Sequence, residues 1–109
     1  MTNTHRPGTI HYLAHPGMDH GTRPHVLLGT ANGQALLMAL STIPCRQLGN
    51  TDAYYLPATD THTARGHAAP NRTQRITINA LPAADGYLTH DELMLMWDAW
   101  DDYRTPRRR

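Results

Sequence analysis

The dipeptide Asn32-Gly33 stands between two apolar runs and constrains the fold more than any other feature of this sequence. Val26-Leu27-Leu28 precedes it, and the run from Ala35 to Leu40 follows it. Asn-Gly is the strongest short signal for a two-residue type I′ turn, because both residues tolerate the positive φ that this turn requires. The sequence therefore predicts a β-hairpin over residues 25 to 41.

The predicted turn also sets the register of the two strands. A two-residue loop at Asn32-Gly33 places Arg23 directly opposite Thr42, or opposite Ser41 if the register slips by one residue. Directly opposed residues share a face of the sheet. Pro24 restricts the residue before it to extended backbone, so Arg23 is expected at the start of a strand. A guanidinium beside a hydroxyl is suited to hold a phosphate, although a solvated strand edge explains the same residues.

Three further segments show the patterns of short strands. Thr9 to Ala14 and Arg75 to Leu81 alternate between apolar and polar side chains, and the second of these ends at Pro82. Tyr54-Tyr55-Leu56 is compatible with a two- or three-residue strand. We expect all three to join the hairpin in one sheet.

Two segments lack periodicity and are predicted to be loops. They span Ile43 to Ala53 and Pro57 to Gln74, and so long an irregular segment is typically functional or disordered. The second segment and the residue after it carry four side chains that are suited to a nucleic-acid backbone or to a solvated loop: Arg65, His67, Arg72 and Arg75.

A capping box predicts where a C-terminal helix begins. Thr89 and Glu92 have the spacing of that motif, and Leu88 and Leu93 have the spacing of a hydrophobic staple. Apolar side chains then follow at helical spacing: Leu93, Met96, Trp97, Trp100 and Tyr103. Further apolar residues widen this surface: Met94, Leu95 and Ala99. These additional apolar residues favour either contact with a dimer partner or packing beneath the long loop.

No residue pattern indicates a metal or a cofactor. His11 and His15 are four residues apart, and His15, His20 and His25 recur every five residues, in a region that predicts strand and loop rather than helix. Cys45 is the single cysteine, so there is neither a disulfide nor a Cys/His ligand quartet. We expect no cofactor and no metal site.

Length and composition favour one cytoplasmic domain. A chain of 109 residues forms one core, here over residues 1 to 109, with 1 to 7 and 104 to 109 expected as flexible tails. No apolar run approaches the roughly 20 residues that cross a bilayer, so we expect no membrane partner. The polar N-terminus shows no signal peptide. The net charge is only +1, so nucleic-acid binding would depend on a local patch.

The order of several short motifs resembles the MazF/PemK family of bacterial toxins. Gly8-Thr9-Ile10-His11-Tyr12 resembles the Gly-led first strand of that family, and residues 21 to 28, Gly-Thr-Arg-Pro-His-Val-Leu-Leu, resemble its Arg-Pro-x-Val-Val-type second strand. Ser41-Thr42 resembles the end of its third strand, and residues 86 to 93 resemble the start of its last helix. The resemblance covers most of the chain except residues 43 to 74. The acidic residue that usually follows the opening Gly is absent.

This resemblance implies a fold and an activity. The implied fold is mainly β with a C-terminal α-helix, a small SH3-like curled β-barrel. The implied activity is that of a metal-independent, sequence-selective endoribonuclease, an mRNA interferase of a type II toxin–antitoxin system. In such an enzyme the ribose 2′-hydroxyl attacks the adjacent phosphate and leaves a 2′,3′-cyclic phosphate. The implied partners are single-stranded RNA, a cognate antitoxin and a second copy of the chain.

The resemblance also implies a site at the open end of the hairpin. Arg23 is assigned to stabilise the charge that develops on the phosphate, and Thr42 or Ser41 to hydrogen-bond it. Because arginine is a poor base at neutral pH, His25 or His20 is assigned to proton transfer. His25 is the first candidate, since the predicted register places it on the face of Arg23. The alternative is a nucleic-acid- or protein-binding module on the same barrel, without catalysis.

Overall fold

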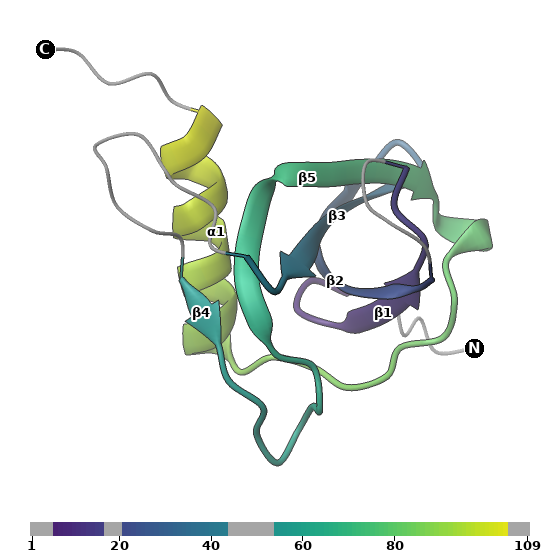
Figure 1. Cartoon of the computed structure of the whole chain (residues 1–109). Coiled ribbons are helices and arrows are strands. Elements are labelled where there is room, and N and C mark those ends of the chain that lie inside the picture. The colour runs from purple at the N-terminus through teal and green to yellow at the C-terminus, as the bar shows by residue number, and fades with distance from the viewer. Residues whose placement is uncertain (1–5, 17–20, 44–53, 105–109) are drawn as a thin grey trace, which may run out of the picture.

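The chain folds into one curled antiparallel sheet with a helix packed beside it, as the computed structural model shows (Figure 1). The structure describes residues 6–16, 21–43 and 54–104. Within these ranges the sheet has five strands: β1 (Ile10–Leu13), β2 (Arg23–Ala31), β3 (Gln34–Ser41), β4 (Tyr55–Leu56) and β5 (Gly66–Thr77). Their order across the sheet is β1-β2-β3-β5-β4. A 3₁₀ turn and a helix follow: η1 (Ile78–Ala80) and α1 (His90–Arg104). The predicted fold class is confirmed.

The hairpin turn has the geometry that the sequence predicts. Asn32 and Gly33 both have positive φ, 55° and 77°, as a type I′ turn requires. Ala31 pairs with Gln34, so the two residues between them form the loop. The predicted hairpin is confirmed, and β2 begins slightly earlier than predicted, at Arg23.

A β-bulge in the middle of β2 changes the register of this hairpin by one residue. On the side of the bulge away from the turn, His25 pairs with Ala39. The same register, continued by two residues, places Arg23 opposite Ser41. The expected pairing of Arg23 with Thr42 is therefore corrected to the alternative that the sequence left open. The reason is that a bulge sets two residues of one strand against one residue of its partner.

The largest difference from the sequence prediction is β5. The pattern of residues 57 to 74 predicts a loop, yet β5 begins at Gly66 and pairs with β3. The buried residues in its first half are Gly66, Ala68, Ala69 and Pro70, not large aliphatic residues, so no apolar alternation marks the strand. Pro70 is tolerated because it falls where the pairing of β3 with β5 is irregular.

The other predicted strands are found with altered ends. β1 and β4 lie inside the segments that the sequence predicts, 9 to 14 and 54 to 56. The strand predicted over 75 to 81 is the end of β5, which stops at Thr77 where η1 begins. Most of the loop predicted over 43 to 53 lies outside the described residues.

Apolar side chains are buried on both faces of the sheet. One cluster lies between the sheet and α1 and includes these residues: Val26, Leu28, Met38, Leu40, Met96 and Ala99. A smaller cluster lies on the other face: Leu27, Ala35, Leu37 and Leu81. We call these the helix face and the opposite face. Successive residues of a strand alternate between the two faces. A strand residue away from the bulge is therefore assigned to the face opposite that of its direct neighbours in the strand.

The capping box fixes the start of α1. The Glu92 amide donates to Thr89 Oγ1 at 3.2 Å, and the Thr89 amide donates to Glu92 Oε1 at 2.9 Å, so the prediction is confirmed. The helix ends at Arg104, which donates to Asp101 at 2.9 Å. The predicted C-terminal tail, residues 104 to 109, overlaps the helix at Arg104. Its remaining residues, and residues 1 to 5, lie outside the described ranges. No helix in the described residues is long and apolar enough to cross a membrane.

Candidate functional site

One row of residues crosses the sheet on the opposite face. Ser41 on β3 pairs with His67 on β5, and His67 pairs with Tyr55 on β4. The register of β2 with β3, continued two residues past the pairing of His25 with Ala39, adds Arg23 opposite Ser41. We call these four residues the arginine row. Adjacent strands lie about 4.8 Å apart, so the backbones of Arg23 and His67 are separated by roughly 10 Å. Both side chains can therefore reach one phosphodiester group.

The face of this row follows from its neighbours. Leu40, Ala68 and Leu56, which precede or follow row residues directly in their strands, all belong to the cluster under α1. Alternation along a strand therefore turns the row residues away from the helix.

Two members of the row hold buried nitrogen atoms without a partner. Among the described residues, the buried side-chain polar atoms that lack a hydrogen bond are Arg23 Nε and His67 Nδ1. A buried donor or acceptor left unpaired costs about 1–3 kcal/mol, and such groups are uncommon in native structures. Both fall in the arginine row, so the row holds two buried polar nitrogens that no described protein group satisfies.

The two candidate hydroxyl residues differ in their surroundings. Ser41 is half-buried, and its Oγ accepts a hydrogen bond from the Ile43 amide at 3.0 Å. This bond uses a lone pair and leaves the hydroxyl proton to donate to a ligand. Thr42 is exposed and follows the last residue of β3. The structure therefore brings Ser41 to Arg23 and leaves Thr42 beyond the strand.

His25 is enclosed in the protein. Its ring is fully buried, Nδ1 donates to the Arg23 carbonyl at 2.8 Å, and Nε2 accepts from the Gln74 amide group at 3.3 Å. The ring stacks on His15 with centroids 5.6 Å apart. Burial lowers the pKa of His25 to about 4, with a smaller lowering from His15 and His11 and an opposing effect of the Arg23 carbonyl. His25 is therefore neutral near pH 7, and it anchors the backbone of Arg23. His20 lies outside the described residues.

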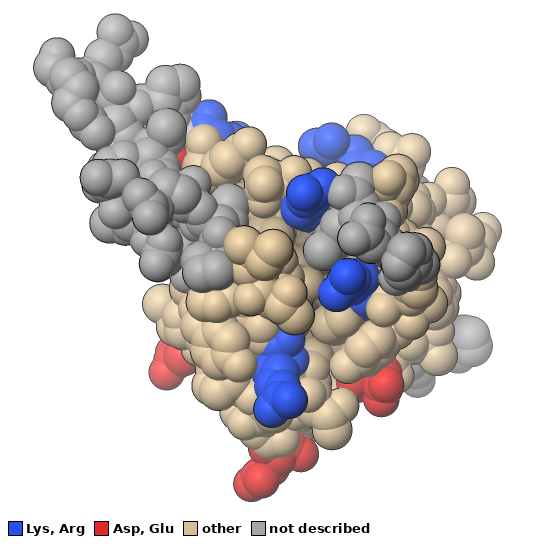
Figure 2. Space-filling model, viewed as in Figure 1, with Lys and Arg blue, Asp and Glu red and all other residues tan. Residues whose placement is uncertain are grey.

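The remaining predicted residues do not gather at one point. Arg65 is exposed just before β5, and Arg72 is half-buried on β5. Arg75 is exposed and pairs with Leu36, which packs against the helix-face cluster. All ten cationic residues of the chain are arginine. Figure 2 shows several of them following a line down the middle of one face, with acidic side chains toward the lower edge.

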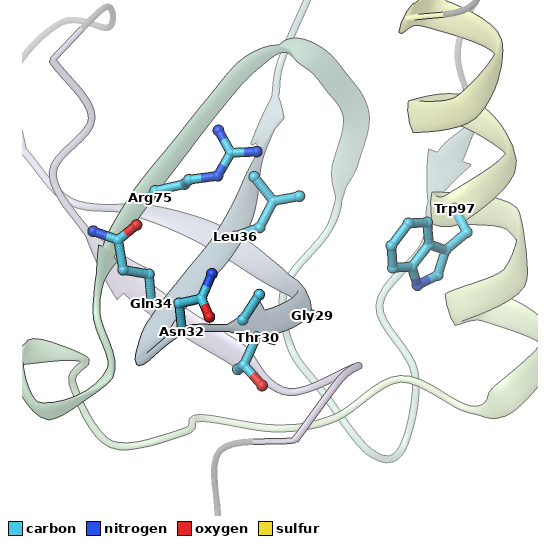
Figure 3. Close-up of a pocket in the computed structure, with 8 residues that line it drawn as sticks. Gly29, Thr30, Asn32, Gln34, Leu36, Arg75 and Trp97 are labelled. Carbon is cyan, nitrogen blue, oxygen red and sulfur yellow. The ribbon is translucent and has the colours of Figure 1, made fainter.

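A groove of about 400 Å³ lies at the closed end of the hairpin, on the helix face (Figure 3). We call it the Trp97 groove. Eight residues line it: Gly29, Thr30, Ala31, Asn32, Gln34, Leu36, Arg75 and Trp97. A Cβ built on Gly29 would lie 3.7 Å from Trp97 Cζ2, so the missing side chain keeps the groove open. The groove and the arginine row lie at opposite ends of the hairpin and on opposite faces of the sheet.

A buried histidine that the sequence analysis did not single out lies against the start of α1. His62 Nδ1 donates to the Ala64 carbonyl at 2.9 Å, and its Nε2 lies 3.4 Å from Glu92 Oε2. Glu92 also acts on Tyr54. Burial is the larger cause that raises the pKa of Tyr54, and the negative charge of Glu92 is the smaller one. Gly86 has φ 115°, and a Cβ there would lie 2.8 Å from His62 Cβ, so the chain crosses this histidine closely. We interpret this cluster as structural, because its groups bond one another.

The described residues contain no group of three or more His, Cys, Asp or Glu that could hold a metal ion. The arginine row instead offers a guanidinium, a hydroxyl, an imidazole and a phenol ring. These groups suit a ligand that carries a phosphate and an aromatic base.

Comparison with known proteins gives a match in structure and none in sequence. The sequence matches no protein-family model and no curated protein. Among solved structures, an endoribonuclease in complex with its cognate antitoxin, from a mycobacterial species, superposes with a TM-score of 0.60. The match covers 90% of each chain at 12% sequence identity. The chain therefore shares the fold of that endoribonuclease, whereas the assignment to MazF/PemK stays a prediction.

Proposed function

We propose that this protein is an endoribonuclease toxin that cleaves single-stranded RNA and is neutralised by a cognate antitoxin. The shared fold supports the class of activity. The observation that carries the proposal is the half-buried Arg23, whose Nε is enclosed without a partner and whose register position lies opposite Ser41. A cation held in this way is oriented before a substrate binds.

The proposed reaction is the attack of a ribose 2′-hydroxyl on the adjacent phosphate. The 2′-oxygen forms a bond to phosphorus, the bond to the 5′-oxygen breaks, and the products are a 2′,3′-cyclic phosphate and a 5′-hydroxyl. Negative charge grows on the nonbridging oxygens, where Arg23 stabilises it without reorganisation. The hydroxyl of Ser41 donates a hydrogen bond to the same phosphate, with the exposed Thr42 as the alternative donor. No step of this scheme uses a metal ion.

The surroundings of the row suit an unpaired strand of RNA. Tyr55, at the end of the row, is exposed and offers a ring on which an unstacked base can lie. Arg65 and Arg72, which precede and follow the start of β5, are proposed to contact the RNA backbone, since most such contacts go to phosphate. Sequence selectivity would come from bases near the row.

The exposed apolar residues of α1 support a protein partner. Met94, Leu95 and Tyr103 are each about 40% exposed, which is unusual for large apolar side chains grouped on one helix. We propose that a second copy of the chain covers them and that the antitoxin binds the assembled toxin.

The test is to incubate the purified protein with a defined RNA in EDTA and to map the ends of the fragments. Cyclic phosphate ends are expected, and Arg23→Gln, purified in parallel, should leave the RNA intact while its circular dichroism spectrum is unchanged. The competing hypothesis is a binding module without catalysis, which the Trp97 groove favours. Intact RNA retained by the wild-type protein would support that module and reject the nuclease.

A further inference from the structure

We propose that His67 is the general base of the cleavage reaction and accepts the proton of the attacking 2′-hydroxyl. This inference rests on the proposed ribonuclease function and assigns one of its steps to a specific side chain. As the 2′-oxygen bonds to phosphorus, its proton passes to the neutral imidazole. The departing 5′-oxygen takes a proton from water, and the imidazolium then returns its proton to solvent.

The reaction needs such a group because Arg23 cannot provide it. A guanidinium holds its proton at any physiological pH, so it stabilises charge but does not act as a base. Histidine is the side chain whose ordinary titration lies closest to neutral pH. The base must also lie within hydrogen-bond reach of the 2′-oxygen while Arg23 holds the phosphate.

Three of the described histidines are buried and bonded elsewhere. His25 is bonded at both ring nitrogens. His11 is fully buried and lies 2.8 Å from Thr9 Oγ1 and 2.7 Å from the Pro82 carbonyl. His62 is buried beside Glu92, in the cluster that we interpret as structural.

Two others lie off the arginine row. His15 stacks on the ring of His25, and its Nε2 lies 3.3 Å from the Thr73 carbonyl. His90 is exposed at the start of α1, on the other side of the sheet. Among the described histidines, His67 is the one that belongs to the row.

The position of His67 is set by the sheet itself. It pairs directly with Ser41, so its side chain lies on the same face as that hydroxyl. Gly66, the preceding residue, has φ 145°, and a Cβ there would lie 3.0 Å from the Ser41 carbonyl oxygen. This close approach of β5 to β3 places the imidazole beside Ser41 and two strands from Arg23.

Among the described residues, no hydrogen bond to Nδ1 holds the imidazole of His67 in one tautomer. Its Nδ1 is buried without a hydrogen-bond partner, so no protein group fixes which nitrogen carries the proton. The ring of Tyr55 packs edge-on against the imidazole, with centroids 4.9 Å apart, and limits its rotation. Within the described residues, the titratable and charged groups in the row or two positions along the chain from His67 are Tyr55 on β4, Arg23 on β2 and Arg65 just before β5.

The test compares His67→Gln with wild type in single-turnover cleavage of a short RNA across about pH 5 to 9. The wild-type rate should rise with pH and then level off, as is typical of general-base catalysis. The variant should be slower by about 10²- to 10⁴-fold, which is the usual contribution of a general base, and should lack this inflection. Its affinity for an uncleavable analogue, with a 2′-deoxyribose at the cleavage position, should stay within about twofold, because proton transfer is not part of binding.

Two controls separate the outcomes. His90→Gln, on the other side of the sheet, should keep the wild-type profile. His67→Ala should regain activity when imidazole is added to the buffer, which a purely structural role would not produce. Wild-type cleavage with an unchanged profile in His67→Gln would overturn the inference and leave the nuclease proposal standing. Failure of the wild type to cleave any RNA would overturn both.

Discussion

The arginine row and the Trp97 groove each contain an arginine on a strand, but the sheet holds the two side chains in different ways. Arg23 is half-buried, its Nε is enclosed, and its carbonyl is bonded to the buried His25. Arg75 is exposed at the wall of an open groove. A charge that is held still and shielded from water stabilises a transition state, whereas a solvated charge gives a screened attraction. Similar side chains are therefore expected to serve catalysis in one place and binding in the other.

The most direct test of this difference between Arg23 and Arg75 is to neutralise each arginine in turn. We expect Arg23→Gln to lower the single-turnover rate of RNA cleavage by about 10²- to 10³-fold, as the loss of a pre-oriented donor does. Arg75→Gln should change the rate by less than about threefold. Equal losses in the two variants would show that burial does not distinguish the two arginines.

The support of Arg23 should also be sensitive to acid. The pKa of His25 is lowered to about 4, so below its ordinary value of 6.5 the unfolded chain binds a proton that the native ring does not. The free energy of unfolding should therefore fall as the pH decreases from about 6.5 toward 4, by up to roughly 3 kcal/mol. Urea unfolding across this range should show a shallower dependence for His25→Gln. A parallel dependence would mean that other groups cause the loss.

The arginine row and the Trp97 groove also differ in how tightly the chain packs around one glycine in each region, Gly66 and Gly29. Gly66→Val should lower the free energy of unfolding by more than about 2 kcal/mol, because φ is 145° and the new Cβ would meet the Ser41 carbonyl oxygen at 3.0 Å. Gly29→Ala should change it by less than about 1 kcal/mol, since its Cβ meets only Trp97, at 3.7 Å. Denaturant midpoints of the two variants measure the difference. A tolerant Gly66 would show that β3 and β5 are not held tightly together at the row.

The smallest effect concerns the hydroxyl that completes the row. Ser41→Ala should slow cleavage by about tenfold, the value of one hydrogen bond to a charged group. Thr42→Ala should leave the rate within about twofold, because Thr42 follows the end of β3. The reverse order would show that Thr42, rather than Ser41, is the hydroxyl that contacts the phosphate.

Local signals predicted the parts of the fold that depend on few residues. Asn32-Gly33 predicts its turn because the turn requires positive φ at both positions, and Thr89 with Glu92 predicts the start of α1 because each satisfies the amide of the other. β5 escaped prediction since its buried positions are filled by Gly66, Ala68, Ala69 and Pro70. Its partner β3 supplies the pairing that its own sequence does not indicate.

The candidate site was predicted in part for the same reason. Arg23 and the two hydroxyl candidates follow from the hairpin alone. The assignment of Ser41 needed the bulge in β2, which no short motif marks, and the placement of His67 needed β5. The burial of His25, which makes it an anchor rather than a base, depends on contacts with Gln74 and His15 from other parts of the chain.

The bulge in β2 has a consequence for how this chain tolerates changes in length. One added or deleted residue between Arg23 and Asn32-Gly33 would rotate the guanidinium to the other side of the sheet or present it to a different hydroxyl. The number of residues between Arg23 and the turn at Asn32-Gly33 is therefore expected to be fixed. In active relatives we expect this distance along the chain to be invariant, even where the loops before Arg23 and after Ser41 differ in size.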